Sequence, residues 1–202
     1  MRQLTFFILF FSFNCFGQSD SLVLVIGNYK SICALDSVYH YSDSLPEKIT
    51  GYSTIWVFSS STSRLKSIDL QRLTSYIEDG GGLYIGSENW PLQAEANQIT
   101  QEIYLKSSFG NYQASQAEIC TVSGNLRLDS LDSLPAGKTI VAFPMDYRLK
   151  VEAWVSDQPL ILSGELGKGH IIIDGGYSRF YCDQRSYETD MILKAFFDYL
   201  NN

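Results

Sequence analysis

Residues 70–90, LQRLTSYIEDGGGLYIGSENW, decide the fold of this chain. Apolar side chains recur around this stretch at helical spacing, at Ile68, Leu70, Leu73, Tyr76 and Ile77. Glycines 80–82 then end the helix, because a left-handed residue just past the last turn is nearly free of strain only for glycine. Residues 83–85 follow as an apolar strand. A helix, a glycine stop and a strand in direct succession form half of a βαβ unit.

The residues before this stretch supply the other half of the unit. Residues 54–58, TIWVF, predict a strand, and residues 59–63 form the loop that enters the helix. Ser67 is the predicted N-cap, because its hydroxyl can accept hydrogen bonds from the free N–H groups of the first turn. Asp69 would face the positive end of the helix dipole. The helix is therefore expected to begin near Ile68.

The rest of the chain alternates strands and helices. An apolar run at 22–26, LVLVI, is typical of a parallel strand buried on both faces. Further strands are expected at 118–122, 139–143 and 151–155, and helices at 93–104 and 190–200, with a short helix around 31–39 left open. Residues 160–162 and 170–173 predict a β-hairpin. The pattern predicts a three-layer α/β/α fold with a mainly parallel sheet, to which the C-terminal antiparallel hairpin adds an edge.

The composition and charge bound the class of protein. The chain has 202 residues, which suits one domain, and 45% hydrophobic residues, which suits a globular core. The formal net charge of −7, without a cluster of Lys or Arg to offset it, argues against a nucleic-acid partner. After the N-terminus, no stretch is long and apolar enough to predict a transmembrane segment.

The N-terminus has the pattern of a targeting segment. Arg2 precedes an apolar run at 4–13, and Cys15 and Gly17 then supply small residues at the two sites before the expected cut. We therefore interpret residues 1–17 as a cleaved signal peptide and residues 18–202 as a single exported domain, in the periplasm, at the cell surface or secreted. A lipoprotein anchored through Cys15 is the alternative, although the residues just before Cys15 depart from the usual pattern.

Three cysteines remain after the signal peptide: Cys33, Cys120 and Cys182. An exported location permits disulfides, and the odd count leaves at least one thiol outside any intramolecular pair. The spacings match no zinc-binding pattern. We expect at least two of the three to be buried structural cysteines, and the sequence does not say which pair.

A set of motifs occurs in a characteristic order. It consists of YIEDGGGL at 76–83, a helix carrying Asn97 that leads to FG at 109–110, GKGHI at 167–171 continuing to Asp174, and a closing amphipathic helix. In this order the motifs resemble the class I glutamine amidotransferase-like superfamily and cover most of residues 22–200. The resemblance implies a flavodoxin-like α/β fold.

Two departures from that superfamily bear on activity. Its active members place a cysteine on the sharp turn after the strand that here is 83–85, where this chain has Gly86, Ser87 and Glu88. They also place a His-x-Glu pair after a late strand, whereas residues 173–178 contain no histidine. The chain thus looks like the branch without the catalytic cysteine, found as accessory domains in exported and membrane-associated bacterial proteins. The resemblance implies that glutaminase chemistry is absent.

Loops that follow the carboxyl ends of strands form the ligand crevice of open α/β sheets. The candidate ligand-binding residues at these positions are Asn28, Ser87, Glu88, Trp90, Asp174, Tyr177 and Arg179. Trp90 facing Tyr177 and Arg179 would suit a sugar or a peptide, because aromatic faces and planar hydrogen-bonding groups recognise both. The alternatives are a plain turn at Asn28 and a Trp90 that covers the hydrophobic core.

No residue is assigned a catalytic or metal-binding role. A nucleophilic Ser87 would need a histidine to take its proton, and nothing in the sequence places His40 or His170 beside it. Glu88 and Asp174 could act as an acid–base pair or hold a cation, or they could be loop acids and helix caps. The glycine-rich stretches lack the spacing of phosphate loops, so no cofactor is expected.

These patterns favour an exported, non-catalytic binding or accessory module of the bacterial cell envelope. Its partner would be a protein or a small polar ligand such as a glycan, bound by loops at the strand carboxyl ends. Two alternatives stay open. One is a hydrolase of the same fold that acts on a glycan or amide through Ser87 or the Glu88 and Asp174 pair, and the other is a structural subunit of an envelope assembly.

Overall fold

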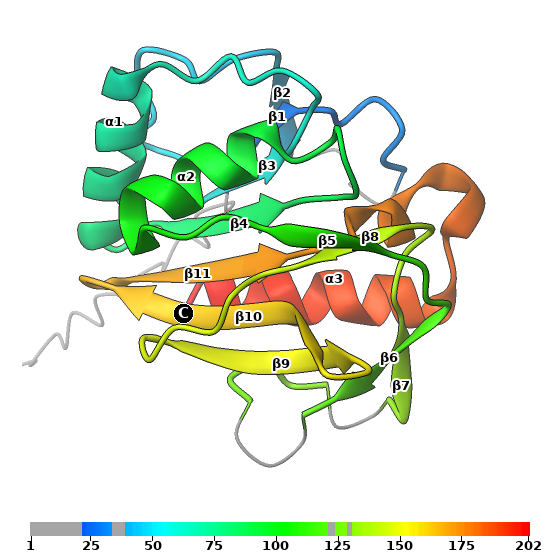
Figure 1. Cartoon of the computed structure of the whole chain (residues 1–202). Helices are drawn as coiled ribbons and strands as arrows, with labels where there is room; N and C mark the ends of the chain where they lie inside the picture. Colours follow the sequence, from blue (N-terminus) through cyan, green and yellow to red (C-terminus); the bar gives the residue numbers. More distant parts are fainter. Residues whose placement is uncertain (1–21, 34–38, 121–123, 129–130) are drawn as a thin grey trace, which may run out of the picture.

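A computed structural model describes residues 22–33, 39–120, 124–128 and 131–202 of the chain (Figure 1). The elements in order are β1 Val23–Gly27, β2 Tyr39–Ser42, β3 Thr54–Phe58, α1 Ser67–Glu78, β4 Gly82–Gly86, α2 Ala94–Tyr104, β5 Phe109–Tyr112, β6 Gln116–Ile119, β7 Ser133–Pro135, β8 Ile140–Ala142, β9 Leu149–Val155, β10 Gln158–Leu166, β11 Gly169–Asp174, the 3-10 turns η1 Tyr177–Phe180 and η2 Cys182–Gln184, and α3 Tyr187–Leu200. The proposed signal peptide, Cys15 and most of the open helix at 31–39 lie outside the described residues.

The main sheet has a parallel half and an antiparallel half. Its strand order is β2-β1-β3-β4-β11-β10-β9-β6-β7, and the strands from β2 to β11 in that order pair in parallel. The pairs from β11 through β7 are antiparallel. The hairpin of β10 and β11 was expected at an edge, and this placement is wrong. β11 is buried along both faces, so it pairs with β4 inside the sheet, and β10 starts the antiparallel half.

Helices cover both faces of the sheet, which confirms the predicted three layers. In Figure 1, α1 and α2 lie on one side of the strands and α3 lies on the other. One row of paired side chains packs beneath α1 and α2: Leu24, Ile55, Leu83 and Ile171. The adjacent row packs against α3: Val25, Trp56, Tyr84 and Ile172. Every strand residue in both rows is fully buried, as expected for parallel strands covered on both faces.

The three glycines after α1 serve three different purposes. Gly80 has φ +115° and ends the helix, as the sequence predicts. A Cβ at Gly81 would overlap the ring of Tyr76, and a Cβ at Gly82 would overlap the carbonyl oxygen of Leu200 in α3. The stretch therefore stops one helix and lets β4 approach another closely.

The start of α1 differs by one residue from the prediction. Lys66, not Ser67, is the N-cap, and Ser67 is the first residue of the helix. The side chain of Asp69 accepts a hydrogen bond from the backbone N–H of Lys66 at 3.0 Å. This contact from inside the first turn satisfies a donor at the helix start, so the serine hydroxyl is not needed there.

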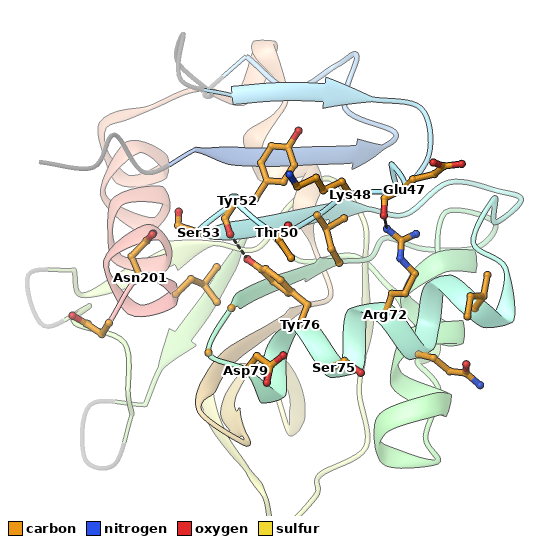
Figure 2. Close-up of a pocket in the computed structure, with 17 residues that line it drawn as sticks. Glu47, Lys48, Thr50, Tyr52, Ser53, Arg72, Ser75, Tyr76, Asp79 and Asn201 are labelled. Carbon is orange, nitrogen blue, oxygen red and sulfur yellow. Dashed lines mark hydrogen bonds between the residues drawn. The ribbon is translucent and has the colours of Figure 1, made fainter. Parts of the chain in front are cut away.

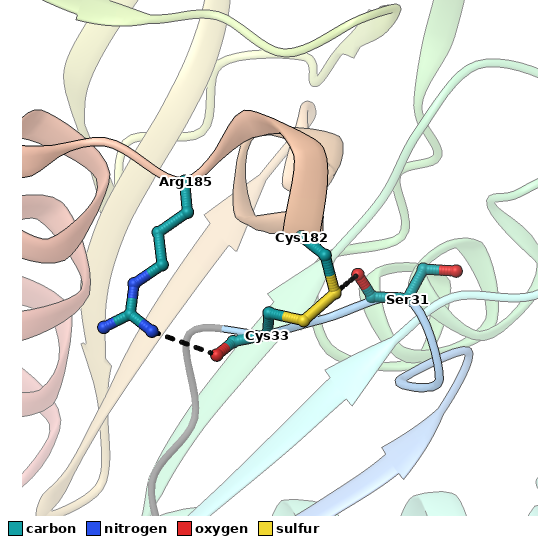
Figure 3. Close-up of a disulfide and its surroundings, with 4 residues drawn as sticks. All are labelled: Ser31, Cys33, Cys182 and Arg185. Carbon is teal, nitrogen blue, oxygen red and sulfur yellow. Dashed lines mark hydrogen bonds between the residues drawn. A yellow bond between two sulfur atoms is a disulfide. The ribbon is translucent and has the colours of Figure 1, made fainter.

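A disulfide joins Cys33, after β1, to Cys182 in η2 (Figure 3). Their Cα atoms are 4.7 Å apart, and both residues are exposed. The backbone on either side is tied together as well, because the Cys182 N–H donates to the Ser31 carbonyl at 3.1 Å. The expectation that at least two of the cysteines are buried structural residues is wrong, since only Cys120 is even half-buried. Among the described residues, no helix combines the length and apolar character needed to cross a bilayer.

Candidate functional site

The carboxyl ends of β4 and β11 lie side by side and bring most of the predicted site residues together. The Ser87 N–H donates to the Asp174 carbonyl at 2.7 Å, and the Tyr177 N–H donates to the Ser87 carbonyl at 3.2 Å. Five of the seven predicted residues are at most 1% exposed: Ser87, Glu88, Asp174, Tyr177 and Arg179. The sequence correctly predicted that these residues lie at one edge of the sheet, but it also predicted that they are exposed there. The structure instead buries them as one polar cluster.

An ion pair lies at the centre of this cluster. Arg179 NH2 is 3.1 Å from Asp174 Oδ1, with both side chains fully buried. Asp174 also accepts hydrogen bonds from the Tyr84 hydroxyl at 2.8 Å and from the Gly176 N–H at 2.9 Å. Burial, followed by the charge of Asp174, holds the pKa of the Tyr84 hydroxyl well above its usual value, so it remains a donor. The Asp174 carboxylate is thus engaged at both oxygens, as a buried charge requires.

Glu88 is engaged in the same way. Its Oε1 accepts from the Ser178 N–H at 3.0 Å, and its Oε2 accepts from the Thr139 hydroxyl at 2.6 Å. Burial raises the pKa of Glu88, and the hydrogen bonds from Ser178 and Thr139 oppose part of that rise. Each oxygen of this buried carboxyl therefore already has a hydrogen-bond donor from the chain.

Tyr177 connects the cluster to β1 and β3. Its hydroxyl donates to the Ser59 carbonyl at 2.7 Å and accepts from Asn28 Nδ2 at 3.1 Å. Burial raises the pKa of this hydroxyl as well. Asn28, the site residue predicted after the first strand, therefore acts as a partner of Tyr177 and is half-buried.

Ser87 and the two histidines do not form a catalytic arrangement. Ser87 Oγ is buried and has no hydrogen-bond partner within the described part of the chain. His40 lies on the edge strand β2 and hydrogen-bonds the Tyr52 hydroxyl. His170 packs edge-on against Tyr199, with ring centroids 4.7 Å apart, and stands near the start of β11, whereas Asp174 ends it. Neither histidine can take a proton from Ser87 in this geometry.

Trp90 is exposed and does not belong to the buried cluster. It is 73% exposed, so it does not cover the hydrophobic core, which answers the alternative left open by the sequence. Its backbone N–H donates to Asn111 Oδ1 at 2.9 Å. Because Tyr177 and Arg179 are buried, the predicted surface of Trp90 facing these two residues does not exist in this conformation.

The residues that bury the cluster were not predicted. They come from the segment 136–139 between β7 and β8. The Lys138 N–H donates to Ser178 Oγ at 2.7 Å, and Thr139 bonds Glu88. Gly137 has φ +119°, and a Cβ there would lie 2.9 Å from the Gly176 carbonyl oxygen, so only glycine lets this segment pack so closely. The glycine is the one sequence signal that could have suggested this contact.

A separate cavity lies at the opposite edge of the sheet, by the amino ends of the strands (Figure 2). It measures about 810 Å³ and is lined by the segment 47–53 before β3, one side of α1 from Ile68 to Tyr76, the residues 79–81 before β4 and the end of α3. The Tyr76 hydroxyl donates to the Tyr52 carbonyl at 3.2 Å on its wall. Arg72, a cationic side chain of α1 that lines the cavity, is already bonded to Asp69 and to the backbone of residues 46 and 47. No sequence pattern pointed to this cavity.

Metal binding finds no support among the described residues, where no group of three or more His, Cys, Asp or Glu side chains could hold an ion.

Comparison with known proteins bears on the fold. No protein-family model matches the chain, and no curated protein matches it either. Among solved structures, a cytoplasmic protein from Salmonella typhimurium superposes with a TM-score of 0.65 at 14% identity, over 90% of this chain and 100% of its own. A protein described as ThuA-like from Parabacteroides merdae gives a TM-score of 0.61 at 8% identity, over 89% of each chain. The chain has a class I glutamine amidotransferase-like fold.

The same fold also occurs within larger enzymes. A β-galactosidase from Bacillus circulans sp. alkalophilus superposes with a TM-score of 0.59 at 12% identity, over 90% of this chain but only 31% of the galactosidase. At these identities the glutamine amidotransferase-like fold is what is shared, and the site has to be judged from its own residues. In this fold β4 leads to Gly86, Ser87 and Glu88, the position where the sequence resemblance puts the nucleophile of active members.

Proposed function

We propose that this chain is an exported, non-catalytic binding or accessory module of the bacterial cell envelope. The observation that carries the proposal is the state of the cluster after β4. Ser87 Oγ is buried without a histidine beside it, and the carboxylates of Glu88 and Asp174 are held by hydrogen bonds and an ion pair. These groups stabilise the fold and present no nucleophile or free acid to a substrate.

Two features support the exported location. The N-terminal residues 1–17 have the pattern of a signal peptide. The disulfide between Cys33 and Cys182 is exposed on the surface, and disulfides of this kind persist in oxidising compartments rather than in the reducing cytosol. Expression of the full chain followed by fractionation, with N-terminal sequencing of the exported form, tests this part. Recovery of the uncut chain in the cytosol contradicts it.

A fluorophosphonate probe tests the absence of a serine nucleophile. We expect no covalent adduct on the folded protein, because the Ser87 hydroxyl is buried and lacks a base. The Ser87→Ala variant is the matched control, and a known serine hydrolase treated in parallel shows that the probe is active. An adduct that appears on the wild type and disappears in Ser87→Ala refutes the non-catalytic assignment.

The structural-subunit alternative has one observation in its favour. Leu105, Met145 and Tyr147 are 79%, 63% and 96% exposed. The Arg148 guanidinium stands over the rings of Tyr104, at the end of α2, and of Tyr147, so the end of α2 and the segment 145–148 lie close together. Exposed apolar side chains of this kind can bind another protein. Stable co-purification with an envelope complex that is lost in Leu105→Asp selects this alternative. Trp90→Ala, which removes an exposed aromatic side chain outside this group, serves as the comparison.

A further inference from the structure

The polar groups that a ligand can reach lie apart from the buried cluster. Arg179 Nε and NH1 have no hydrogen-bond partner in the described part of the chain, but the side chain is fully buried, so no ligand reaches them. Another cavity, of about 460 Å³, lies beside the carboxyl ends of β1 and β3. It is lined by Gly27, Asn28, Lys30, Asp43, Ser60, Ser61, Thr62, Arg64 and Glu95.

The strand order places this cavity where an open α/β sheet leaves room for a ligand. The chain leaves β1 for β2 on one side and then returns to β3 on the other side of β1. The strand order therefore reverses between β1 and β3, and the loops after these two strands form a crevice at that point. Of the residues that the sequence predicted for ligand binding, Asn28 lines this crevice.

The loops that form the walls of the cavity are fixed by hydrogen bonds. The Ser60 N–H donates to Glu95 Oε2 at 2.6 Å, and the Ser60 hydroxyl donates to Oε1 at 2.8 Å. The Ala94 N–H donates to the Ser60 carbonyl at 3.1 Å, so the loop after β3 is held by the start of α2. The Asn28 N–H donates to the Phe58 carbonyl at 2.7 Å and joins the other wall to β3. Walls that are formed in advance lower the entropic cost of binding.

The side chains at the mouth of the cavity are exposed and only loosely engaged. Lys30, Ser61 and Thr62 are exposed, and their side chains make no hydrogen bond or ion pair within the residues that the structure describes. Arg64 NH1 is 3.7 Å from Asp43 Oδ2, and the two side chains are 65% and 62% exposed. An exposed pair at this distance contributes little stability, so both groups can turn to a ligand at small cost.

The lining suits a neutral ligand that is rich in hydroxyl groups. All nine lining residues are polar or glycine, whereas pockets for apolar ligands are lined mostly by hydrophobic side chains. Two cations, Lys30 and Arg64, are balanced by two acids, Asp43 and Glu95, so the lining has no net formal charge that would attract an ion. A sugar hydroxyl both donates and accepts, so it can donate to Asp43 while it accepts from a lysine or an arginine. Hydrogen bonds with charged groups are among the stronger ones.

We propose that this cavity binds a neutral sugar, with Asp43 accepting from its hydroxyl groups and Lys30 and Arg64 donating to them. The inference rests on the proposed binding function and names the class of ligand. A peptide is less suitable, because its side chains need apolar contacts or its backbone needs the edge of a sheet, and the lining offers neither.

Titration of the 15N-labelled, disulfide-bonded protein by NMR tests the proposal. The neutral probes are glucose, galactose and N-acetylglucosamine, and the comparisons are glucuronate, galacturonate and N-acetyl-alanine amide. We expect a neutral sugar to shift the backbone signals of Lys30, Ser61 and Thr62 and to leave unchanged those of Ser75 and Tyr76, in the cavity of Figure 2. Its uronic acid should bind more weakly, because it adds a negative charge near two acids, and the peptide amide should not bind. Whichever neutral sugar binds most tightly identifies the stereochemistry that the cavity selects.

Two variants change the recognising groups without touching the core. Asp43→Asn keeps the size of the side chain and should weaken the binding of the neutral sugar about tenfold, as expected for the loss of a hydrogen bond to a charged group. Lys30→Gln should weaken it about fivefold. Asp157→Asn and Lys168→Gln, at exposed positions in the turns after β9 and β10, are the matched controls and should bind like the wild type. Thermal unfolding followed by circular dichroism should give the same midpoint for all four variants.

Several results overturn the inference. They are the absence of a shift with all three neutral sugars, tighter binding of a uronic acid or of the peptide amide, shifts centred on Ser75 and Tyr76, and unchanged affinity in Asp43→Asn. None of these depends on labelling by the fluorophosphonate probe. A labelled Ser87 therefore defeats the proposed function separately, whereas absent sugar binding defeats only the assignment of this cavity.

Discussion

The buried ion pair between Arg179 and Asp174 should be one of the costliest contacts in the domain to break. In Arg179→Met, the Asp174 carboxylate keeps only the Tyr84 hydroxyl and the Gly176 N–H as partners. Removing one partner of a buried pair costs about 3–5 kcal/mol of unfolding free energy, because the remaining charge is left uncompensated. Loss of the hydrogen bond from Arg179 to the Ala136 carbonyl adds about 1 kcal/mol.

Replacing both partners should restore part of this loss. In the double variant Arg179→Met with Asp174→Asn, no uncompensated charge remains, so the two changes should be coupled by about 2 kcal/mol or more. Urea unfolding of the four proteins, followed by tryptophan fluorescence, to which the buried Trp56 contributes, gives the coupling free energy. If Arg179→Met lowers the unfolding free energy by less than about 1 kcal/mol, the reasoning is refuted, because a loss of that size is typical of an ion pair exposed to solvent.

Three further predictions follow from particular contacts. Cys33→Ser should lower the unfolding free energy by about 2–5 kcal/mol, because the bond to Cys182 closes a loop across 149 positions of sequence; the oxidised wild type treated with dithiothreitol should show the same loss in urea unfolding, and an unchanged midpoint contradicts it. Burial raises the pKa of Glu88 above its ordinary 4.5, so the folded state keeps this proton to a higher pH than the unfolded state does. The contribution of Glu88 to the unfolding free energy therefore falls as the pH rises from the unfolded-state pKa through the folded-state pKa. As the pH rises above 4.5, Glu88→Gln should therefore gain stability relative to the wild type, and a relative loss with rising pH in urea titrations counts against the buried carboxyl. Gly169→Ala should cost more than about 1 kcal/mol, because its Cβ would overlap the carbonyl oxygens of Gly81 and Ile77, and a thermal midpoint equal to that of the wild type would be inconsistent with the close contact.

Local sequence patterns predicted most of the fold. The apolar runs of β1, β3 and β4 and the helical periodicity of α1, α2 and α3 depend on near neighbours, so the three layers could be predicted and were confirmed. Strand order is a different kind of information, because it is set by contacts between distant segments. The apolar run that became β11 looks the same at an edge as beside β4, and the short strands β2 and β7 bury too few side chains to leave a pattern.

The site was predicted in position but not in exposure. Topology alone brings Ser87 and Asp174 to the same edge, since parallel strands end together. Whether that edge is open depends on the segment 136–139, whose sequence has no periodicity and whose packing is decided by Gly137. The buried cluster and the orphan donors of Arg179 therefore became visible only in three dimensions.

The central claim is that the position after β4 is sealed and serves the fold. The Ser87→Cys variant tests this most directly when it is made in residues 18–202 together with Cys120→Ser, so that its thiol is the only one outside the disulfide. The account predicts that the new thiol reacts with Ellman's reagent only as fast as the domain unfolds and that glutaminase activity stays absent, because Ser87 is fully buried and no histidine stands beside it. Reaction of the folded variant at the rate of the urea-unfolded chain, or any release of ammonia from glutamine, would contradict it.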